Sequence, residues 1–286
     1  MAFLFRKKKQ KATNIRPVAP VKLDYRAVAI TDVGSVRDSN EDHLVFIRPF
    51  DTAIRDSHGC LALVADGMGG HSHGEIASQM AADIITRHYF DTNYSVLEAL
   101  KRAFEKANKS IFQKAVKNPS LKGMGTTCTA VILQQNQLYL GHVGDSRAYL
   151  LKGDRTLQLS NDHTLVQHLL DTGRITQKES LSHPQRNIVT RAMGTAAKVK
   201  ADFALLSLQF EVGDKLLICS DGLYEYIQAP ELQAIIQRNK LNEASHALIE
   251  LAKQRGGHDN ISVLIVEAFA ADTDQIAKQT QKINLS

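Results

Sequence analysis

The chain has 286 residues, of which 43% are apolar, and its formal charge at neutral pH is +5. This length and composition allow a sizeable buried core in one large domain or two small ones, so we expect a globular protein. No apolar run approaches the roughly 18 residues of a membrane span, so we expect a soluble, cytoplasmic protein.

The positive charge is concentrated at the N-terminus. Residues 1–22 contain seven Lys or Arg and no Asp or Glu, whereas the remainder contains 28 basic and 30 acidic residues. We interpret 1–22 as a basic, disordered tail, and contact of this tail with an anionic membrane surface or an acidic partner is the less favoured alternative. It does not have the order of a signal peptide, because its short apolar stretch precedes the charges. The body carries no net positive charge, so no nucleic-acid partner is expected.

Three cysteines, Cys60, Cys128 and Cys219, lie in or beside apolar, strand-like segments and show no C-x-x-C spacing. This pattern favours buried thiols in a reducing compartment over a disulfide or a zinc site.

Apolar periodicity predicts strands in adjacent pairs and helices in pairs. The predicted strands are 26–33, 43–47, 60–65, 126–133, 137–143, 148–151, 156–159, 215–219 and 261–266. The predicted helices are 75–90, 96–116, 231–237 and 243–253. This order shows no regular βαβ alternation, so a doubly wound parallel sheet is not expected and sheets covered by helix pairs are favoured. A segment at about 165–190 contains Pro, Gly and a short helix, and is interpreted as a flap over a site.

Acidic residues lie where three of the predicted strands end or begin. Asp66-Gly67 and Asp221-Gly222 each follow an apolar strand, and Asp259-Asn260 directly precedes one. Taken alone, each Asp-Gly pair is typical of a hairpin turn. However, Asp66 leads into Gly67-Met-Gly-Gly-His71 and then into helical periodicity rather than into a partner strand. If the strand ends converge, the aspartates repel one another unless a cation lies among them, and oxygen donors of this kind select Mg²⁺ or Mn²⁺.

A second charged cluster lies between two predicted strands, at Arg37, Glu41 and Asp42. The functional interpretation is an arginine that forks onto phosphate oxygens, with Glu41 and Asp42 holding metal-bound water. The alternative is an ordinary charged loop with local ion pairs. A third segment, Gly144–Arg147, is typical of a turn and gains interest only from its combination with the others.

Together these segments resemble the metal-dependent protein serine/threonine phosphatases of the type 2C class, particularly the bacterial members. The resemblance spans about residues 23–269 and is carried by eight short motifs in the same order. They are Arg37-x-x-Asn-Glu-Asp42, Asp66-Gly-Met-Gly-Gly-His71, Gly125-Thr-Thr127, Gly144-Asp-Ser-Arg147, Asp162-His163, Arg191-Ala-Met-Gly194, Ser220-Asp-Gly-Leu223 and Asp259-Asn260.

The resemblance implies an α+β fold, in which a β-sandwich of two mostly antiparallel sheets is flanked by helix pairs, with the active site at one end of the sandwich. It implies a catalytic domain over 23–269, followed by a polar C-terminal tail over 270–286. It also implies metal-dependent hydrolysis of phosphoserine and phosphothreonine in proteins. The implied partners are phosphorylated proteins and a cognate serine/threonine kinase or its targets, and the expected oligomeric state is a monomer.

The resemblance further implies the roles of single residues. Asp66 bridges two Mn²⁺ or Mg²⁺ ions, the Gly67 carbonyl binds one of them, and Asp221 and Asp259 bind the other. Asp145, together with Asp221, matches a third, weaker ion position. Arg37, Asp66 and Asp221 are the expected catalytic residues.

One position departs from the pattern of many eukaryotic relatives. There the residue two after the bridging Asp is a histidine thought to protonate the leaving group, whereas here it is Met68, and a thioether has no proton to donate. His43 and His71 are the nearest imidazoles in the sequence, and a metal-bound water is the other alternative. The flap is expected to influence which phosphoprotein docks.

Two other classes of function compete with this interpretation. A pseudophosphatase that only binds phosphoproteins would require a lost metal ligand, yet the three key aspartates are present. A membrane-anchored scaffold would place the activity of the protein in residues 1–22. Both are less favoured than the enzyme.

Overall fold

The computed structural model describes residues 21–69 and 73–271. The strands are β1 (Leu23–Asp32), β2 (Asp42–Ile47), β3 (Cys60–Met68), β4 (Gly125–Thr126), β5 (Cys128–Gln134), β6 (Gln137–Val143), β7 (Arg147–Lys152), β8 (Arg155–Gln158), β9 (Asp202–Gln209), β10 (Lys215–Cys219) and β11 (Ile261–Ala270). The helices are α1 (Thr52–His58), α2 (His73–Phe90), α3 (Val96–Lys117), the 3₁₀ turn η1 (Pro119–Leu121), α4 (Leu165–Asp171), α5 (Gln177–Leu181), α6 (Asp221–Tyr224), α7 (Ala229–Arg238) and α8 (Leu241–Gln254).

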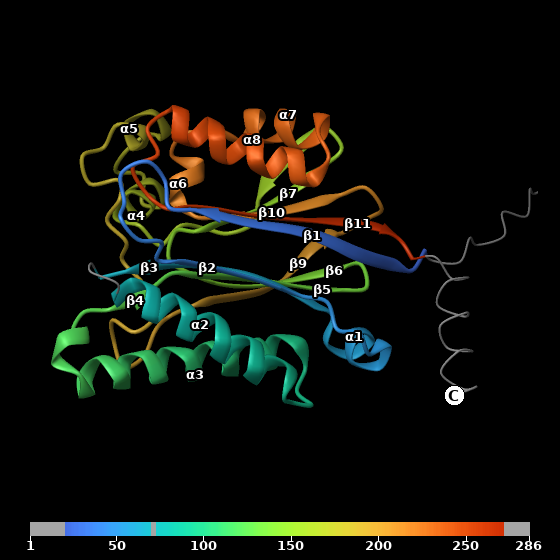
Figure 1. Ribbon diagram of the computed structural model, residues 1–286, viewed down its shortest axis with the longest axis horizontal. Coiled ribbons are helices and arrows are strands. Elements are labelled where there is room, and N and C mark those ends of the chain that lie inside the picture. The colour runs from blue at the N-terminus through green and yellow to red at the C-terminus, as the bar shows by residue number, and fades with distance from the viewer. Residues whose placement is uncertain (1–20, 70–72, 272–286) are drawn as a thin grey trace, which may run out of the picture. The chain divides into compact units, whose positions relative to one another are not determined.

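Two antiparallel sheets pack face to face, and a helix pair covers the outer side of each (Figure 1). One sheet has the order β1-β11-β10-β7-β8 and lies under α7 and α8. The other has the order β2-β3-β5-β6-β9, with β4 paired to the end of β3, and lies against α2 and α3. The predicted sandwich with flanking helix pairs is confirmed.

The chain divides into two units, of which the larger comprises residues 23–270 and the other comprises 1–22 and 271–286. The larger unit contains both sheets and every residue predicted for the site. The predicted basic tail over 1–22 and polar tail over 270–286 fall almost entirely outside the described residues and stay predictions. Within the described residues, no helix is both long and apolar enough to cross a bilayer.

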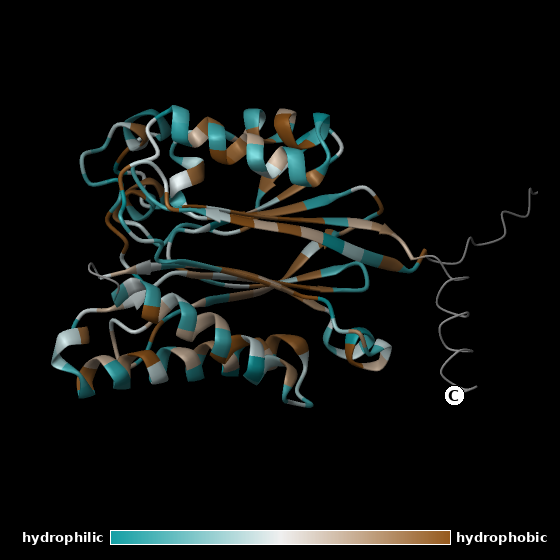
Figure 2. Ribbon diagram, viewed as in Figure 1, coloured by the Kyte–Doolittle hydropathy of each residue, from teal (hydrophilic) through white to brown (hydrophobic). Residues whose placement is uncertain are grey.

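The apolar side chains of the strands form three layers, because successive side chains of a strand point to opposite faces of its sheet. On β3, Leu61, Leu63 and Ala65 pack toward α2 and α3, whereas Ala62 and Val64 pack between the two sheets. A third cluster fills the space between the first sheet and helices α7 and α8. In Figure 2 the brown, apolar residues run along the strands between the helix layers. β3 is therefore buried on both faces, and this burial fixes which face of the sheet each of its side chains takes.

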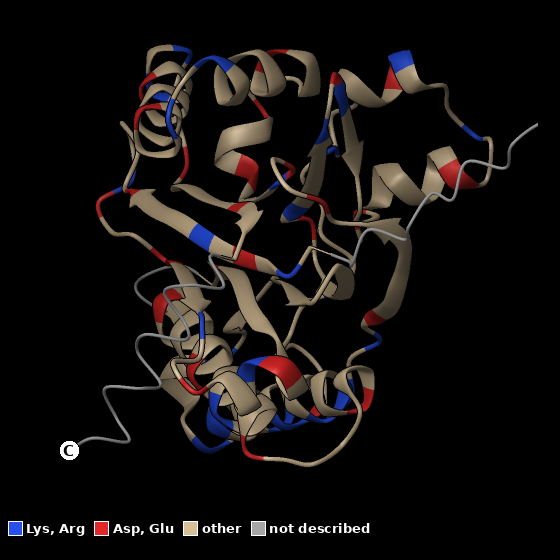
Figure 3. Cartoon of the chain, turned by 90° about the vertical axis from the view of Figure 1, so that its right-hand side faces the viewer, with Lys and Arg blue, Asp and Glu red and all other residues tan. Residues whose placement is uncertain are grey.

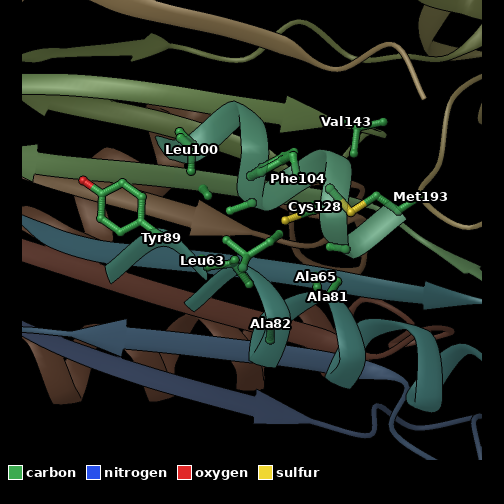
Figure 4. Close-up of a cluster of buried hydrophobic side chains, with 14 of the residues drawn as sticks. Leu63, Ala65, Ala81, Ala82, Tyr89, Leu100, Phe104, Cys128, Val143 and Met193 are labelled. Carbon is green, nitrogen blue, oxygen red and sulfur yellow. The ribbon is translucent and has the colours of Figure 1, made fainter. Parts of the chain in front are cut away.

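Helix α3 illustrates how the sequence places a helix on a sheet. Leu100, Phe104 and Ile111 recur at helical spacing and are fully or almost fully buried against the second sheet. Figure 4 shows Leu100 and Phe104 among the buried side chains. The basic residues of α3 lie between these positions and face outward, where Figure 3 shows Lys and Arg gathered on the lower helices. This division between an apolar and a charged face is the usual signature of a helix that covers a core.

Some elements differ from the predictions. Helix α1 has no buried residue, so it lacks the apolar periodicity on which the prediction relied. Strand β9 is an edge strand whose residues alternate between exposed and half-buried, and its apolar run 203–206 obscured the alternation. The predicted flap contains α4 and α5, where one short helix was expected. The three cysteines are buried and unpaired, as predicted.

Candidate metal centre

The predicted acidic residues come together at one end of the sandwich. Asp66 lies near the end of β3, directly opposite Asp42 on β2. Asp221 begins α6 immediately after β10, and Asp259 lies just before β11, so these two come from the other sheet. Asp145 lies in the turn between β6 and β7. Each sheet therefore contributes carboxylates to the same site, which the order of the strands alone did not establish.

The charges of these groups strongly affect one another. Loss of hydration raises the pKa of Asp66 well above its usual value, and the neighbouring charges of Asp42, Asp221, Asp145 and Asp259 raise it further. The pKa of Asp221 is raised in the same way, by burial and then by Asp145 and Asp259. Burial raises the pKa of Asp42 to about 6 and that of Asp145 to about 7. Several carboxylates that disfavour each other's ionisation form a site that attracts cations.

Two buried carboxylate oxygens at this site have no hydrogen-bond partner among the described residues. They are Oδ1 of Asp221 and Oε1 of Glu41. An ionised oxygen that is removed from water and left without a partner is costly. A divalent cation, or water held by one, would supply the missing interaction, so these residues fit a metal centre.

The aspartates do not form a closed cage by their side chains alone. Across residues 21–69 and 73–271, no three His, Cys, Asp or Glu side chains converge closely enough to enclose one ion. Mg²⁺ keeps several waters and is commonly bound through only one or two carboxylates. A donor set completed by water and by a main-chain carbonyl is therefore compatible with this spacing.

Gly67 is the predicted main-chain position. A Cβ atom built on Gly67 would lie 2.3 Å from the Gly74 carbonyl oxygen and 2.6 Å from that of Glu41. Glycine is thus required here by close backbone approach, and the Gly67 amide donates to the Glu41 carbonyl over 3.1 Å. Gly74 is needed for the same reason, since its Cβ would lie 2.6 Å from the carbonyl carbon of Gly67. Sequence reasoning missed Gly74, which carries no chemical signal of its own.

Hydrogen bonds to Asp42 and Asp66 connect the site to the rest of the sandwich. The hydroxyl of Ser262 on β11 donates to Asp42 Oδ2 over 2.6 Å, which joins the two sheets at this end. Thr127 Oγ1 accepts from the Asp66 amide at 3.0 Å, and the Thr126 hydroxyl donates to the Asp66 carbonyl at 2.9 Å. These two threonines explain the Gly125-Thr-Thr127 motif, for which the sequence suggested no role.

Arg37 lies at the edge of the site and pairs with a predicted ligand. Its Nη2 donates to Asp259 Oδ2 over 2.7 Å, and both side chains are partly exposed. The loop that carries Arg37 is held by Asn260, whose side-chain Nδ2 donates to the carbonyls of Val33 and Ser39. A guanidinium fixed beside the acidic cluster is suited to bind an anion that approaches from solvent.

The two histidines considered as proton donors differ in position. His43 follows Asp42 on β2, and its neighbours at alternate positions, Val45 and Ile47, pack on the helix side of the sheet. Because Asp42 faces the opposite side, His43 lies across the sheet from the carboxylates. His71 lies outside the described residues. His43 is therefore an unsuitable donor to the leaving group.

A cavity of about 600 Å³ opens beside the acidic cluster. Asp145 and Asp221 lie in its wall, together with residues of α4, α5 and the following turn, among them Arg186 and Asn187. The remaining wall comes from β7, from β8 and the residues that follow it, and from α6 and the residues after it. The segment predicted as a flap thus shares one cavity with two of the predicted ligands.

Comparison with known proteins identifies the class. Residues 26–261 match the family described as protein phosphatase 2C. The serine/threonine phosphatase stp of Listeria innocua is 38% identical over 244 residues, which cover 83% of this chain and 93% of that protein. The crystal structure of the Mycobacterium tuberculosis serine/threonine phosphatase PstP/Ppp is 37% identical, covers 85% of this chain and 98% of its own, and has a TM-score of 0.75.

A further solved structure is the catalytic domain of the phosphatase PstP in complex with two manganese ions. It is 34% identical, with 86% of this chain and 99% of that chain covered and a TM-score of 0.74. The chain belongs to the protein phosphatase 2C family. Its activity is that of a protein serine/threonine phosphatase, the hydrolysis of phosphoserine and phosphothreonine in proteins, and it depends on divalent metal.

The raised carboxyl pKa values predict a pH-dependent stability of the metal-free protein. A carboxyl group with a raised pKa in the folded state binds protons more tightly there than in the unfolded chain. The contribution of this group to the free energy of unfolding therefore falls as pH rises from its ordinary pKa of 3.8 to the raised pKa. Above the raised pKa this contribution no longer changes with pH. For Asp42, with a pKa of about 6, the loss is on the order of 3 kcal/mol.

Denaturant unfolding in excess chelator should thus show stability falling between about pH 4 and 6, and the fall should be smaller in Asp42→Asn. Added Mn²⁺ should remove most of it, because the ion compensates the ionised carboxylates. A stability that is flat over this range in chelator would contradict the described electrostatics.

Proposed function

We propose that Asp66, Gly67, Asp221 and Asp259 hold two divalent cations at the end of the sandwich. The observation that carries this proposal is the buried, partnerless Oδ1 of Asp221 within a cluster of carboxylates that raise one another's pKa values. In this arrangement Asp66 would be a ligand of both ions, the Gly67 carbonyl a ligand of one, and Asp221 and Asp259 ligands of the other. Mn²⁺ is the first choice to test, since a related catalytic domain binds two manganese ions, and Mg²⁺ has the same preference for oxygen donors.

Asp145 is proposed as a ligand of a third, weaker ion together with Asp221. The charge of Asp145 raises the pKa of Asp221, and both carboxylates lie in the wall of one cavity. Glu41 and Asp42 are proposed to hold water around the ions. The Oε1 of Glu41 is free to accept a hydrogen bond, whereas Asp42 is kept in place by Ser262.

The chemistry of the site follows from its charges. Bound ions would neutralise the phosphoryl oxygens and lower the pKa of water at the site. Arg37 is proposed to fork onto the phosphoryl group and align it for attack opposite the ester oxygen. The products are inorganic phosphate and the free serine or threonine hydroxyl. In this proposal the acidic residues supply the metal ligands, Arg37 orients the phosphoryl group, and the two sheets hold both in place.

The oligomeric state, the location and the substrate docking of the enzyme are also proposals. We propose that it acts as a monomer on phosphoproteins made by a serine/threonine kinase. A cytoplasmic location is supported by three buried, unpaired cysteines, because disulfides are rare in that compartment. The cavity beside the site supports docking of substrate residues against the flap.

The metal assignment predicts strict dependence on added cation. Full-length protein treated with chelator should hydrolyse an aryl phosphate and a phosphothreonine peptide only after Mn²⁺ is restored. Asp221→Asn should weaken Mn²⁺ binding, measured by calorimetry, on the order of 10²-fold or more, because a ligand is lost. Asp154→Asn, an exposed acid in the turn after β7, is the matched control. Equal turnover in excess chelator would sink the proposal.

The role of Arg37 predicts a different signature. Arg37→Ala should lower kcat/KM for the aryl phosphate by about 10²-fold, because one positioned donor to the developing charge is lost. Mn²⁺ affinity should change much less. Arg37→Lys should recover only part of the rate, since an ammonium cannot fork. A variant that loses metal and activity together would show that Arg37 acts by supporting Asp259 instead.

The flap proposal predicts an effect on large substrates only. Arg186 lines the cavity and lies 3.9 Å from Glu225 across it. Arg186→Ala should lower kcat/KM for a phosphoprotein by up to roughly fivefold, as expected for a partly exposed charged contact, and leave aryl phosphate hydrolysis unchanged. Arg174→Ala, an exposed flap residue away from the cavity, is the control. Equal effects on both substrates would argue against docking at the flap.

A further inference from the structure

Three sequence motifs without an assigned role meet behind Asp145. They are the turn Gly144–Arg147, the pair Asp162-His163 and the segment that begins at Arg191. His163 lies at their centre and is only 5% exposed. Its contacts reach the turn on one side and the flap on the other.

On the first side, His163 binds Gly144 through two hydrogen bonds. The His163 amide donates to the Gly144 carbonyl over 2.7 Å, and the Gly144 amide donates to His163 Nδ1 over 3.1 Å. Gly144 has a φ of +105°, and a Cβ there would lie 2.5 Å from Thr127 Cβ. The turn that carries Asp145 is thus clamped between Thr127 and His163, and only glycine fits.

On the other side of the ring, Nε2 lies 3.1 Å from Asp202 Oδ2 at the start of β9. Arg191 Nη1 lies 3.1 Å from the same Nε2 and 3.4 Å from the second oxygen of Asp202. Burial lowers the pKa of His163, although Asp202 opposes the effect. In the neutral ring Nδ1 accepts from Gly144, so the proton is on Nε2 and is donated to Asp202. This carboxylate therefore fixes both the tautomer and the orientation of the ring.

The main chain of His163 closes the base of the flap. Its carbonyl accepts from the Thr190 amide at 2.7 Å and from the Thr190 hydroxyl at 2.9 Å. The next residues pair as well, because Thr164 forms an antiparallel bridge with Val189 and the Leu165 amide donates to Ile188. The two ends of the flap thus meet at the residue that also holds the Asp145 turn.

We propose that His163, oriented by Asp202, is a positioning residue that couples the flap to the ion position at Asp145. This inference rests on the proposed role of Asp145 as a metal ligand. Displacement of the flap base would move the Gly144 clamp, and an ion at Asp145 would stabilise the clamped flap. Coupling of this kind is reciprocal, so ion binding must protect the flap by the same factor by which flap closure strengthens ion binding.

The test measures flap protection directly, without relying on catalysis. The flap contains three sites for trypsin, at Arg174, Lys178 and Arg186. In full-length wild type, increasing Mn²⁺ should slow cleavage within 165–190, and Asp145→Asn should abolish that protection. His163→Phe keeps a ring but has no acceptor, so it should also abolish protection and weaken the weakest Mn²⁺ binding step in calorimetry by roughly 10- to 100-fold.

Two further variants separate positioning from general stability. His163→Asn restores an acceptor near the Nδ1 position and should recover most of the protection. Asp202→Asn should also reduce the protection and weaken Mn²⁺ binding, but less than His163→Phe does. It replaces His163→Phe in the test if that variant does not fold. His168→Ala, an exposed flap histidine, should behave as wild type.

The outcomes decide between the proposals. If His163→Phe and Asp202→Asn keep Mn²⁺-dependent protection, or if every ion is weakened equally along with the melting temperature, the coupling is refuted and His163 is merely structural. If wild type shows metal-dependent turnover but no protection of the flap, the coupling fails while the proposed function stands. If wild type binds no Mn²⁺, the proposed function itself fails, and the coupling fails with it.

Discussion

The mutual repulsion of carboxylates at one end of the sandwich is the constraint on which the site depends. Asp66 is surrounded by Asp42, Asp221, Asp145 and Asp259, each of which disfavours its ionisation. The acids stay close together only if the backbone that carries them cannot move apart in response to this repulsion. The two sheets provide that resistance, because each acid is attached to or directly beside a strand whose register is fixed by apolar side chains on both faces.

The neutral hydrogen bonds around the acids are as informative as the acids themselves. Ser262 crosses from one sheet to Asp42 on the other, and Asn260 binds the loop that carries Arg37 through three hydrogen bonds. None of these bonds cancels a charge. These hydrogen bonds position the acids but do not neutralise their charge. An ion site that is preorganised requires positioned ligands whose charge is still available to a cation.

The sequence predicted the parts of this site that carry a chemical signal. Apolar runs that end in Asp66 and Asp221 indicated the strands and the ligands together, and the structure places both acids in one electrostatic cluster. Gly74 and Thr127 were missed because their importance comes from contacts with segments far away in the chain. His43 was a wrong candidate for a reason already present in the sequence, since adjacent strand residues face opposite sides. Strand β9 was missed because edge strands are only half-buried.

The origin of the ligands along the chain has a further consequence for folding. Asp66 belongs to the sheet built mainly from the first half of the domain, whereas Asp221 and Asp259 precede or follow strands of the other sheet. An ion shared between them therefore joins residues almost two hundred positions apart, and it can do so only after both sheets have packed. Binding energy from such an ion stabilises the whole sandwich rather than one loop. On the proposed set of ligands, bound metal would thus cross-link the two halves of the fold at the place where the chemistry occurs.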